Sequence, residues 1–304
     1  MRLGTSMLDN NTLICYNIWP LFADHILDYS KEYYKHYGVE RLHNKDNFIP
    51  ENVKEGEIVF VKTDFIADGT FYQHFFPGIK NKFKLITGNS SYQLGNHTPL
   101  DQLKSILDSP KLITWFCTNP PDLKHEKIVS LPIGFEEMSR AGGNQLLLNN
   151  ARKRQRYFWH KEDKVFLPYH GSTNPQRASQ VNFLSSFEFV KAQHEKQDIL
   201  DYLNDIDKYK FVICLGGAGN DLHRIYETYL MGSIPIVQKS SLEKLFSFYD
   251  LPVVMVDRWE NFDKLLIATY RAYSPGDVLV KKLENVGRFL MACNYKNLFE
   301  TGNF

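Results

Sequence analysis

The sequence predicts an α/β fold of two domains, each built around a parallel sheet, with a cleft between them. Short apolar runs alternate with helical patterns over most of the 304 residues. Strands this apolar are typical of parallel sheets that helices cover on both faces. Residues 141–163, rich in glycine, asparagine and arginine, interrupt the alternation and indicate a connection. We therefore expect an N-terminal domain at residues 1–150 and a C-terminal domain at residues 151–304.

Runs of β-branched and aromatic residues predict the strands of both domains. In the first half these are residues 57–62 (EIVFVK), 82–87 (KFKLIT), 111–117 (KLITWFC) and 128–133 (IVSLPI). In the second half they are residues 164–169 (KVFLPY), 209–215 (YKFVICL), 234–237 (IPIV) and 253–256 (VVMV). Helices are expected at residues 222–231, 242–248, 259–273 and 276–291. The last of these packs either within the C-terminal domain or back on the N-terminal domain.

Composition excludes several classes of protein. A hydrophobic fraction of 43% with 23% charged residues is that of a soluble globular chain, and a net charge of +1 gives no field for nucleic acid. The basic run from Arg152 to Arg156 is either a solvated helix or linker face, or a weak contact with a membrane surface or an anionic acceptor. The four cysteines have no metal or redox spacing, and no apolar leader or membrane-length stretch occurs. We expect a cytoplasmic protein with reduced thiols.

The segment at residues 214–237 has the order strand, glycine-rich loop, helix, strand. In parallel sheets the loop that leaves a strand's carboxyl end lines the ligand crevice, and the following helix directs its N–H groups toward an anion there. Gly216, Gly217 and Gly219 are expected to allow close backbone approach and positive φ. Asn220 or Asp221 is expected to cap the helix.

Three side chains on the predicted helix share one face, because His223, Arg224 and Glu227 are three and four positions apart. A cation in the first turn opposes the helix dipole, so Arg224 indicates a phosphate beside it. Glu227, one turn deeper, would accept hydrogen bonds from ribose hydroxyls. This pattern predicts a nucleoside diphosphate site. The alternative is a structural turn with a surface ion pair; a dinucleotide fingerprint fails because Leu222 occupies its third glycine position.

Residues 209–262 resemble the C-terminal signature of exostosin-like glycosyltransferases. The shared features are a Lys-Phe strand, the glycine-rich loop, Asp-x-His-Arg, a following Glu, Gly-x-Ile-Pro, the strand LPVVMV and the aromatic-acidic Trp-Glu. Weaker similarity extends to VFVKTDF, FKLITGNSSY, SLPIGFEE and HGSTNPQR, and so covers most of the chain. One departure from the family is Ser91, because members often carry an Asp at this position. An acidic role of that position is therefore not carried over to this chain.

The resemblance implies a GT-B fold, in which two Rossmann-like domains face a central cleft. The C-terminal domain would hold a nucleotide-sugar donor, expected to be a uridine diphosphate sugar, and the N-terminal domain a glycan acceptor. Transfer would proceed with inversion and without an essential metal or other cofactor. Animal and plant members generally carry a membrane anchor, so a chain without one suggests a microbial or viral source. By analogy the donor-binding residues are Gly171, Arg177, Gly217, Gly219, Asp221, His223, Arg224 and Glu227.

No metal site is predicted. The one Asp-x-Asp motif, Asp205 to Asp207, precedes a strand, whereas a metal-dependent transferase needs such a pair after a strand at the crevice. We interpret it as a solvated helix end. No cluster of His and Cys ligands occurs either.

Inverting transfer needs a general base that deprotonates the acceptor hydroxyl. The first candidate is Asp64, which follows the strand at residues 57–62, although an Asp there is also a common cap or turn residue. Glu136 and His74 are further candidates, with a solvated carboxylate and a histidine packed among aromatic rings as their structural alternatives. Trp115 and Asn119 are expected to line the acceptor groove.

Two rival functions remain open at this level. The chain could be a catalytically silent module that binds a glycan or a nucleotide sugar, or an α/β oxidoreductase that uses a nicotinamide cofactor. Slow hydrolysis of donor sugars separates the enzyme from the module, and nicotinamide bound to the purified protein would identify the oxidoreductase.

Overall fold

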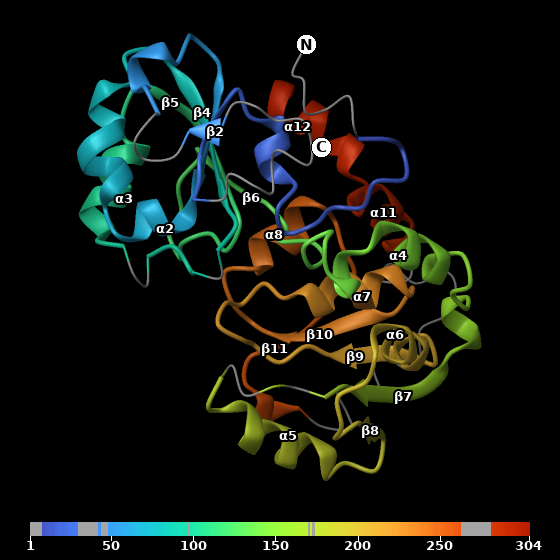
Figure 1. Ribbon diagram of the computed structural model, residues 1–304. Coiled ribbons are helices and arrows are strands. Elements are labelled where there is room, and N and C mark those ends of the chain that lie inside the picture. The colour runs from blue at the N-terminus through green and yellow to red at the C-terminus, as the bar shows by residue number, and fades with distance from the viewer. Residues whose placement is uncertain are drawn as a thin grey trace. The chain divides into compact units, whose positions relative to one another are not determined.

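The computed structural model describes residues 8–29, 42–43, 48–90, 92–95, 98–169, 171, 174–262 and 281–304. The chain divides into two compact units (Figure 1). The N-terminal unit comprises Met1–Ile133 with Ala292–Phe304, and the C-terminal unit comprises Gly134–Met291. Each unit holds one parallel sheet, so the predicted α/β class with two Rossmann-like sheets is confirmed.

The N-terminal sheet has the strand order β2-β1-β3-β4-β5-β6. Every pairing between neighbouring strands is parallel. The bounds are β1 (His25–Leu27), β2 (Leu42–His43), β3 (Ile58–Lys62), β4 (Phe83–Gly88), β5 (Leu112–Cys117) and β6 (Ile128–Ser130). The four predicted runs correspond to β3 to β6, whereas β1 and β2 were not predicted.

Helices and turns cover both faces of the N-terminal sheet. One face packs against α2 (Thr63–Ala67) and α3 (Leu100–Leu107). The other face meets the 3-10 turn η2 (Trp19–Phe22) and α12 (Tyr295–Thr301). Ring centroids of Phe116 on β5 and Phe299 on α12 lie 5.0 Å apart, which is why the C-terminal segment belongs to this unit. Short turns complete it: η3 (Pro50–Asn52), η4 (Phe71–Phe75), η5 (Phe76–Gly78) and η9 (Ala292–Asn294).

The C-terminal sheet has the strand order β11-β10-β9-β7-β8, and its pairings are parallel as well. The bounds are β7 (Glu162–Leu167), β8 (Val190–Ala192), β9 (Tyr209–Ile213), β10 (Ile234–Gln238) and β11 (Val254–Val256). All five residues of β9 are buried, as expected for a central parallel strand. Of these strands, only β8 was not predicted.

Helices lie on both faces of the C-terminal sheet, with α5 on one side and α4, α6 and α7 on the other (Figure 1). Asp198 accepts hydrogen bonds from Leu200 N and Asp201 N and so caps α6. The helix bounds are α4 (Gln145–Arg152), α5 (Arg177–Ser185), α6 (Ile199–Ile206), α7 (His223–Leu230), α8 (Glu243–Phe248) and α11 (Leu283–Phe289). The 3-10 turns are η6 (Ala141–Gly143), η7 (Phe158–His160) and η8 (Trp259–Asn261).

The boundary between the units differs from the predicted one at residue 150. The chain passes into the C-terminal unit after Ile133, at Gly134, whose φ is +72°. Helix α4 spans the predicted boundary and packs on α6 and α7, which is consistent with the assignment of residues 134–150 to the C-terminal unit. Residues 263–273 and 276–280 of two predicted helices, and Ser91, lie outside the described residues.

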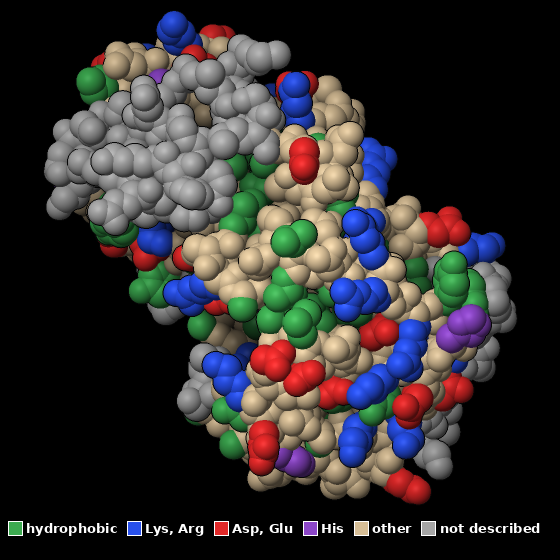
Figure 2. All heavy atoms as spheres, turned by 45° about the vertical axis from the view of Figure 1, so that its right-hand side comes forward, with side chains coloured by type: hydrophobic (Ala, Val, Ile, Leu, Met, Phe, Trp, Pro, Cys, Tyr) green, Lys and Arg blue, Asp and Glu red, His purple; other side chains and the backbone are tan. Residues whose placement is uncertain are grey.

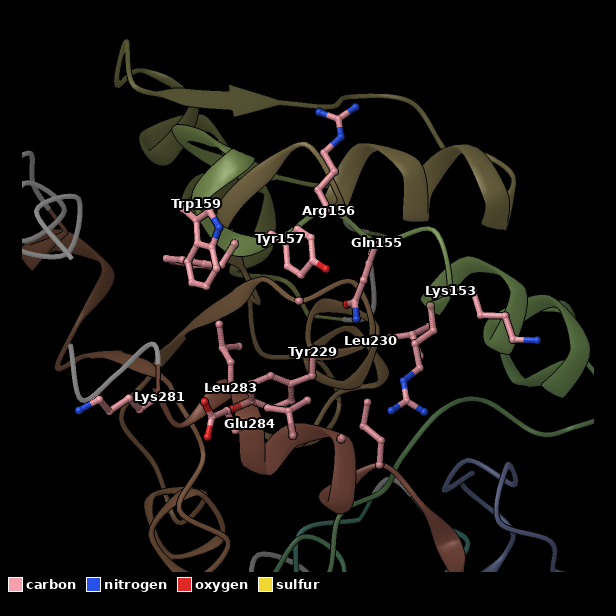
Figure 3. Close-up of a pocket in the computed structure, with 16 residues that line it drawn as sticks. Lys153, Gln155, Arg156, Tyr157, Trp159, Tyr229, Leu230, Lys281, Leu283 and Glu284 are labelled. Carbon is pink, nitrogen blue, oxygen red and sulfur yellow. The ribbon is translucent and has the colours of Figure 1, made fainter. Parts of the chain in front are cut away.

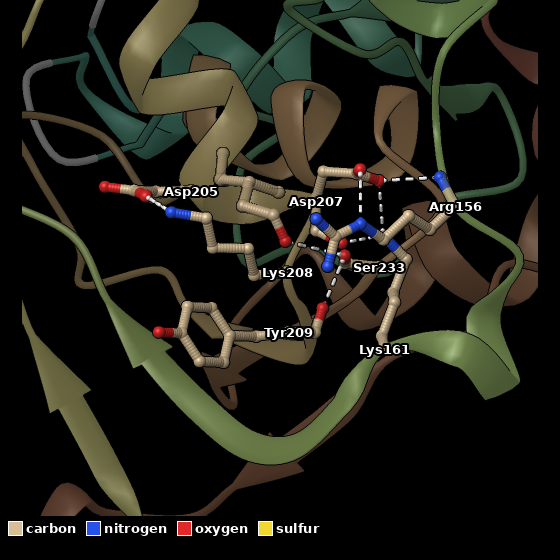
Figure 4. A network of polar contacts seen from close by, with 8 residues as sticks. Arg156, Lys161, Asp205, Asp207, Lys208, Tyr209 and Ser233 are labelled. Carbon is tan, nitrogen blue, oxygen red and sulfur yellow. Dashed lines mark hydrogen bonds and ion pairs between the residues drawn. The ribbon is translucent and has the colours of Figure 1, made fainter.

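A buried ion network at the amino ends of β7 and β9 contains the Asp-x-Asp motif (Figure 4). Lys161 Nζ donates to Asp207 Oδ1 at 2.8 Å and to Asp207 O at 2.7 Å, and Arg156 N donates to the same carboxylate. Asp205 Oδ1 lies 2.6 Å from Lys208 Nζ. Burial lowers the pKa of Lys161, and Asp207 offsets part of that effect. The solvated helix end was therefore the wrong interpretation of Asp207, which stabilises the fold.

Candidate functional site

The carboxyl edge of the C-terminal sheet forms a polar cavity. Its volume is about 210 Å³, and it lies where β9 and β10 end and α5 begins. Gly216 and Asn220 line it from the loop after β9, and Lys239 and Ser240 from the loop after β10. This is the edge at which parallel sheets bind ligands. The residues after β10 were not among the predicted site residues, although the polar run that follows IPIV was the signal for them.

Arg224 lies in the first turn of α7, as predicted, and is partly exposed. Its Nε donates to Tyr202 Oη at 3.0 Å, and its Nη2 donates to the carbonyl of Tyr169 at 2.8 Å. Nη1 has no hydrogen-bond partner among the residues that the structure describes. Burial works against the charge, but Tyr202 and Glu227 outweigh it and raise the pKa of Arg224. The guanidinium is thus charged, oriented, and able to donate to a ligand.

Tyr202 on α6 connects Arg224 to Glu227. Its hydroxyl donates to Glu227 Oε2 at 2.8 Å and accepts from Arg224. Burial and the negative charge of Glu227 raise the pKa of Tyr202 well above its ordinary value. Glu227 is only 8% exposed, and its predicted contact with a ribose stays a prediction. Sequence reasoning missed Tyr202, because a residue 22 positions before Arg224 leaves no local signal.

Arg177 is the first residue of α5, and its guanidinium binds three backbone carbonyls. Nε donates to Gly216 O at 2.8 Å, Nη2 to Leu215 O at 3.0 Å and Nη1 to Gly171 O at 3.2 Å. Burial and the positive charge of Arg224 lower the pKa of Arg177. Both arginines therefore hold the loop after β7, and Arg177 also fixes the loop after β9. Arg177 thus has a structural role in holding these two loops, and its role as a phosphate ligand stays a prediction.

The glycine loop differs from its prediction in two respects. None of Gly216, Gly217 and Gly219 has a positive φ. Asp221 does not cap α7, because both its carboxylate oxygens lie 2.8 Å from the hydroxyl of Tyr226, which donates to them, and Leu222 occupies the N-cap position. A Cβ built on Gly216 would have no atom within 4 Å, so this position keeps open space in front of the backbone.

His223 connects the start of α7 to Gly134. Its Nδ1 lies 2.8 Å from the carbonyl oxygen of Gly134, and because a carbonyl only accepts, Nδ1 is the nitrogen that donates. This contact orients the ring at the beginning of the helix. The predicted position of His223 near a diphosphate or sugar stays a prediction.

Carboxylates gather at the carboxyl edge of the N-terminal sheet. Asp64, in the first turn of α2, is partly exposed, and its Oδ2 lies 3.4 Å from Lys62 Nζ. Asp28 follows β1, is 3% exposed and accepts from Asn89 Nδ2 at 3.0 Å. Burial raises the pKa of Tyr29, and the nearby carboxylates of Asp68, Asp64 and Asp28 add to the effect. Asp28 was not predicted as a site residue, because the strand that precedes it, β1, was not predicted either.

Three other predicted residues lie elsewhere. His74 is exposed on η4, although its neighbours Phe71 and Phe75 are buried, so it is not a packed histidine. Glu136 belongs to the C-terminal unit, where Oε1 lies 3.1 Å from Arg140 Nη1, so it is not a base from the N-terminal domain. Trp115 is 1% exposed and donates from Nε1 to Thr87 Oγ1, which places it in the core and not along an acceptor groove.

The part of the chain that the structure describes shows no group of three or more His, Cys, Asp or Glu residues placed to hold a metal ion. Within the same residues, no helix has both the length and the apolar character needed to cross a membrane. The face drawn in Figure 2 mixes Lys and Arg with Asp and Glu, in line with a net charge of +1.

Comparisons with known proteins give likenesses in structure only. No family model matches the chain, and no curated protein matches it in sequence. A crystal structure of an α1,3-fucosyltransferase has 11% identity and a TM-score of 0.38, over 91% of this chain and 89% of that one. A crystal structure of a GtfA/B complex has 8% identity and a TM-score of 0.39, over 82% of this chain and 57% of that one. At these TM-scores neither likeness assigns a function, and the exostosin-like resemblance stays an expectation.

Proposed function

We propose that the chain is a glycosyltransferase that binds a nucleotide-sugar donor at the carboxyl edge of the C-terminal sheet. The observation that carries the proposal is the pair Arg224 and Arg177, whose guanidinium groups bind carbonyls of the same loop after β7. Each lies in a first helical turn that contains no acid. Burial, and after it the positive charge of Arg224, lower the pKa of Arg177, and a diphosphate placed beside Arg224 relieves the second of these effects.

In this proposal the diphosphate accepts hydrogen bonds from Arg224 Nη1 and lies at the N-terminus of α7, where the helix dipole favours an anion. The adjoining cavity of about 210 Å³ receives a neighbouring part of the donor. Glu227 is buried and holds the Tyr202 hydroxyl, which in turn binds Arg224 Nε. Glu227 therefore acts by positioning Arg224, in place of the direct ribose contact expected from the sequence.

In the proposed reaction, the acceptor hydroxyl attacks the sugar carbon of the donor, and the bond between that carbon and the diphosphate breaks. Arg224 and the α7 N-terminus stabilise the charge that develops on the leaving group. Asp64 is the proposed base that takes the proton of the acceptor hydroxyl, because it is partly exposed while both oxygens of Asp28 accept hydrogen bonds. A uridine diphosphate donor, a glycan acceptor, inversion and independence of metal belong to the same proposal, and they rest on the resemblance of residues 209–262.

The test is a thermal-shift screen of nucleotide sugars, followed by calorimetric titration of the donor that binds. Losing a charge-assisted hydrogen bond costs about 1.5–3 kcal/mol, so Arg224→Ala should weaken donor binding about 10- to 100-fold. Glu227→Ala should weaken it through the displaced arginine, and Tyr202→Phe should reproduce that effect. Arg140→Ala, which removes an exposed arginine outside this edge, is the matched control.

Two outcomes would each contradict a different part of the proposal. Wild-type nucleotide affinity in both Arg224→Ala and Glu227→Ala would show that the site assignment is wrong. Tight donor binding without transfer to any acceptor, and without slow donor hydrolysis, would replace the enzyme by a binding module.

A further inference from the structure

A second pocket lies in the C-terminal unit at the amino ends of β7 and β10. Its volume is about 500 Å³, and it is bounded by residues 152–159, by the turn at Gly232 and by α11 (Figure 3). Pockets of this size hold small ligands. Because the strands are parallel, this pocket lies at the opposite edge of the sheet from Arg224. It therefore belongs to no part of the donor site.

Two aromatic rings form an exposed platform beside this pocket. Tyr157 and Trp159 have parallel ring planes, 3° apart, with centroids separated by 6.2 Å. Their exposed fractions are 70% and 49%, so both side chains are accessible to a ligand. Figure 3 shows the two side chains together, across the pocket from Leu283 and Glu284 on α11. The face of an aromatic ring carries partial negative charge, so it attracts the weakly positive C–H groups on one face of a saturated ring.

Cations line the same pocket. Arg152, Lys153 and Lys281 form no ion pair with a carboxylate in the described part of the chain, whereas Arg156 lies 3.5 Å from Asp207. The strongest contact of the Arg152 guanidinium is a weak one, 3.9 Å to the sulfur of Met291. The pocket lining thus contains four cationic side chains and one carboxylate, Glu284, and this excess of positive charge favours a negatively charged ligand.

Two glycines lie beside polar side chains of the pocket wall. A Cβ on Gly287, inside α11, would lie 3.4 Å from Arg152 Nη2, which is an ordinary van der Waals contact. A Cβ on Gly232 would lie 2.9 Å from Oε1 of Gln155, the end of a flexible side chain, and the φ of +67° at Gly232 by itself favours glycine. The guanidinium of Arg152 and the amide of Gln155 thus border the pocket beside these two glycines.

We propose that this pocket binds an acidic carbohydrate. A sugar ring stacks on Tyr157 and Trp159, and its carboxylate or phosphate meets Arg152. The amide of Gln155 donates hydrogen bonds to the sugar hydroxyls, and the Glu284 carboxylate accepts hydrogen bonds from them. The Glu284 carboxylate disfavours a nucleic-acid backbone, which would bring a line of negative charge past it. A membrane surface fits less well, because the apolar floor of Tyr229, Leu230 and Leu290 is buried and beyond the reach of lipid. The site is independent of whether the chain transfers sugars.

The experiment titrates the full chain calorimetrically with trigalacturonate, glucose 6-phosphate and maltotriose. We expect trigalacturonate or glucose 6-phosphate to bind, with maltotriose at least tenfold weaker, and the affinity to fall as salt rises. The two acidic probes distinguish a carboxylate from a phosphate as the recognised group. Sedimentation with phosphatidylserine vesicles runs in parallel and should show no binding.

Matched variants locate the site. Trp159→Ala and Arg152→Gln should each weaken acidic-sugar binding at least tenfold, and Trp159→Phe should retain most of it. Phe248→Ala, at an exposed ring on α8, and Arg224→Ala should leave it unchanged. The proposal is overturned if neither acidic probe binds, if maltotriose binds equally well, or if Trp159→Ala has no effect. Vesicle binding that depends on Trp159, without sugar binding, would identify a membrane surface instead.

Discussion

Gly216 and Gly143 lie in two loops of the C-terminal unit and differ in what an added methyl group would meet. A Cβ on Gly216 would enter open space beside the polar cavity, whereas a Cβ on Gly143 would lie 2.1 Å from the carbonyl oxygen of Glu137. We therefore expect Gly216→Ala to fold normally and to weaken donor binding about tenfold, because its methyl group occupies ligand space. Gly143→Ala should lower the free energy of unfolding by about 2–4 kcal/mol or prevent folding.

Thermal denaturation with and without the donor measures both effects. Wild-type donor affinity in Gly216→Ala would contradict the placement of a ligand against this loop. Unchanged stability in Gly143→Ala would contradict the packing of the loop at Glu137.

Cys214, directly after β9, predicts a pH dependence of stability. Burial is the main reason that the pKa of its thiol rises to about 12, from an ordinary value of 9.0. A raised pKa means that the folded state keeps a proton that the unfolded chain loses, so this contribution is complete below pH 9 and is lost as the pH rises toward 12. The loss has a slope of at most about 1.4 kcal/mol per pH unit.

Urea denaturation between pH 8 and pH 11 measures this slope. The free energy of unfolding of the wild type should fall more steeply above pH 9 than that of Cys214→Ala. Equal slopes in the two proteins would show that the thiol titrates normally in the folded state.

At the scale of elements, the ion pair between Lys161 and Asp207 joins the segment before β7 to the end of α6. The Lys161 side chain is fully buried, and removing it leaves the buried Asp207 carboxylate to the half-exposed Arg156, whose Nε lies 3.5 Å away. We expect Lys161→Met to lower the free energy of unfolding by about 3–5 kcal/mol. The double variant Lys161→Met with Asp207→Asn should be more stable than the sum of the single changes predicts, which a double-mutant cycle measures. Additive effects would show that the two groups do not interact.

The sequence predicted the elements whose signal is local and missed those that depend on a partner. β9 and β10 are long buried runs, and their bounds agree with prediction to within two residues. β1, with three residues, and β8, with the sequence Val-Lys-Ala, are too short for a periodic pattern and are strands because of their neighbours. The glycine loop needs no positive φ because Arg177, from a different element, holds its carbonyls.

The candidate site shows the same division. Helical spacing placed Arg224 and Glu227 on one face of α7, and the cation in the first turn was a local signal. The Tyr202 hydroxyl that lies between their side chains comes from α6, and only tertiary packing brings it there. The family resemblance implied that Arg177 binds the donor, but its contacts with the carbonyls of Gly171, Leu215 and Gly216 could not be read from the sequence.

At the scale of the whole molecule, the chain returns to the N-terminal unit at Ala292 after completing the C-terminal one. The last helix predicted from the sequence, at residues 276–291, was the one whose packing was left open, and its described part, α11, belongs to the C-terminal unit. α12 was not predicted, and neither was its packing on the N-terminal sheet. The structure assigns it through aromatic contacts, because Phe299 lies 4.9 Å from Phe22 and 5.0 Å from Phe116 between ring centroids. Lys84 on β4 adds a hydrogen bond from Nζ to the carbonyl of Phe299.

This return predicts that a change near the C-terminus loosens the N-terminal sheet. Phe299 is 0% exposed, and truncating a buried Phe costs about 3–5 kcal/mol, so Phe299→Ala should destabilise the N-terminal unit. Hydrogen exchange followed by mass spectrometry should show faster exchange in β3, β4 and β5, with β9 and β10 unchanged. Phe248→Ala, at a ring that is 44% exposed on α8, is the matched control and should change neither sheet. Faster exchange in β9 and β10 of Phe299→Ala, with β3 to β5 unaffected, would place α12 with the C-terminal unit and refute the assignment.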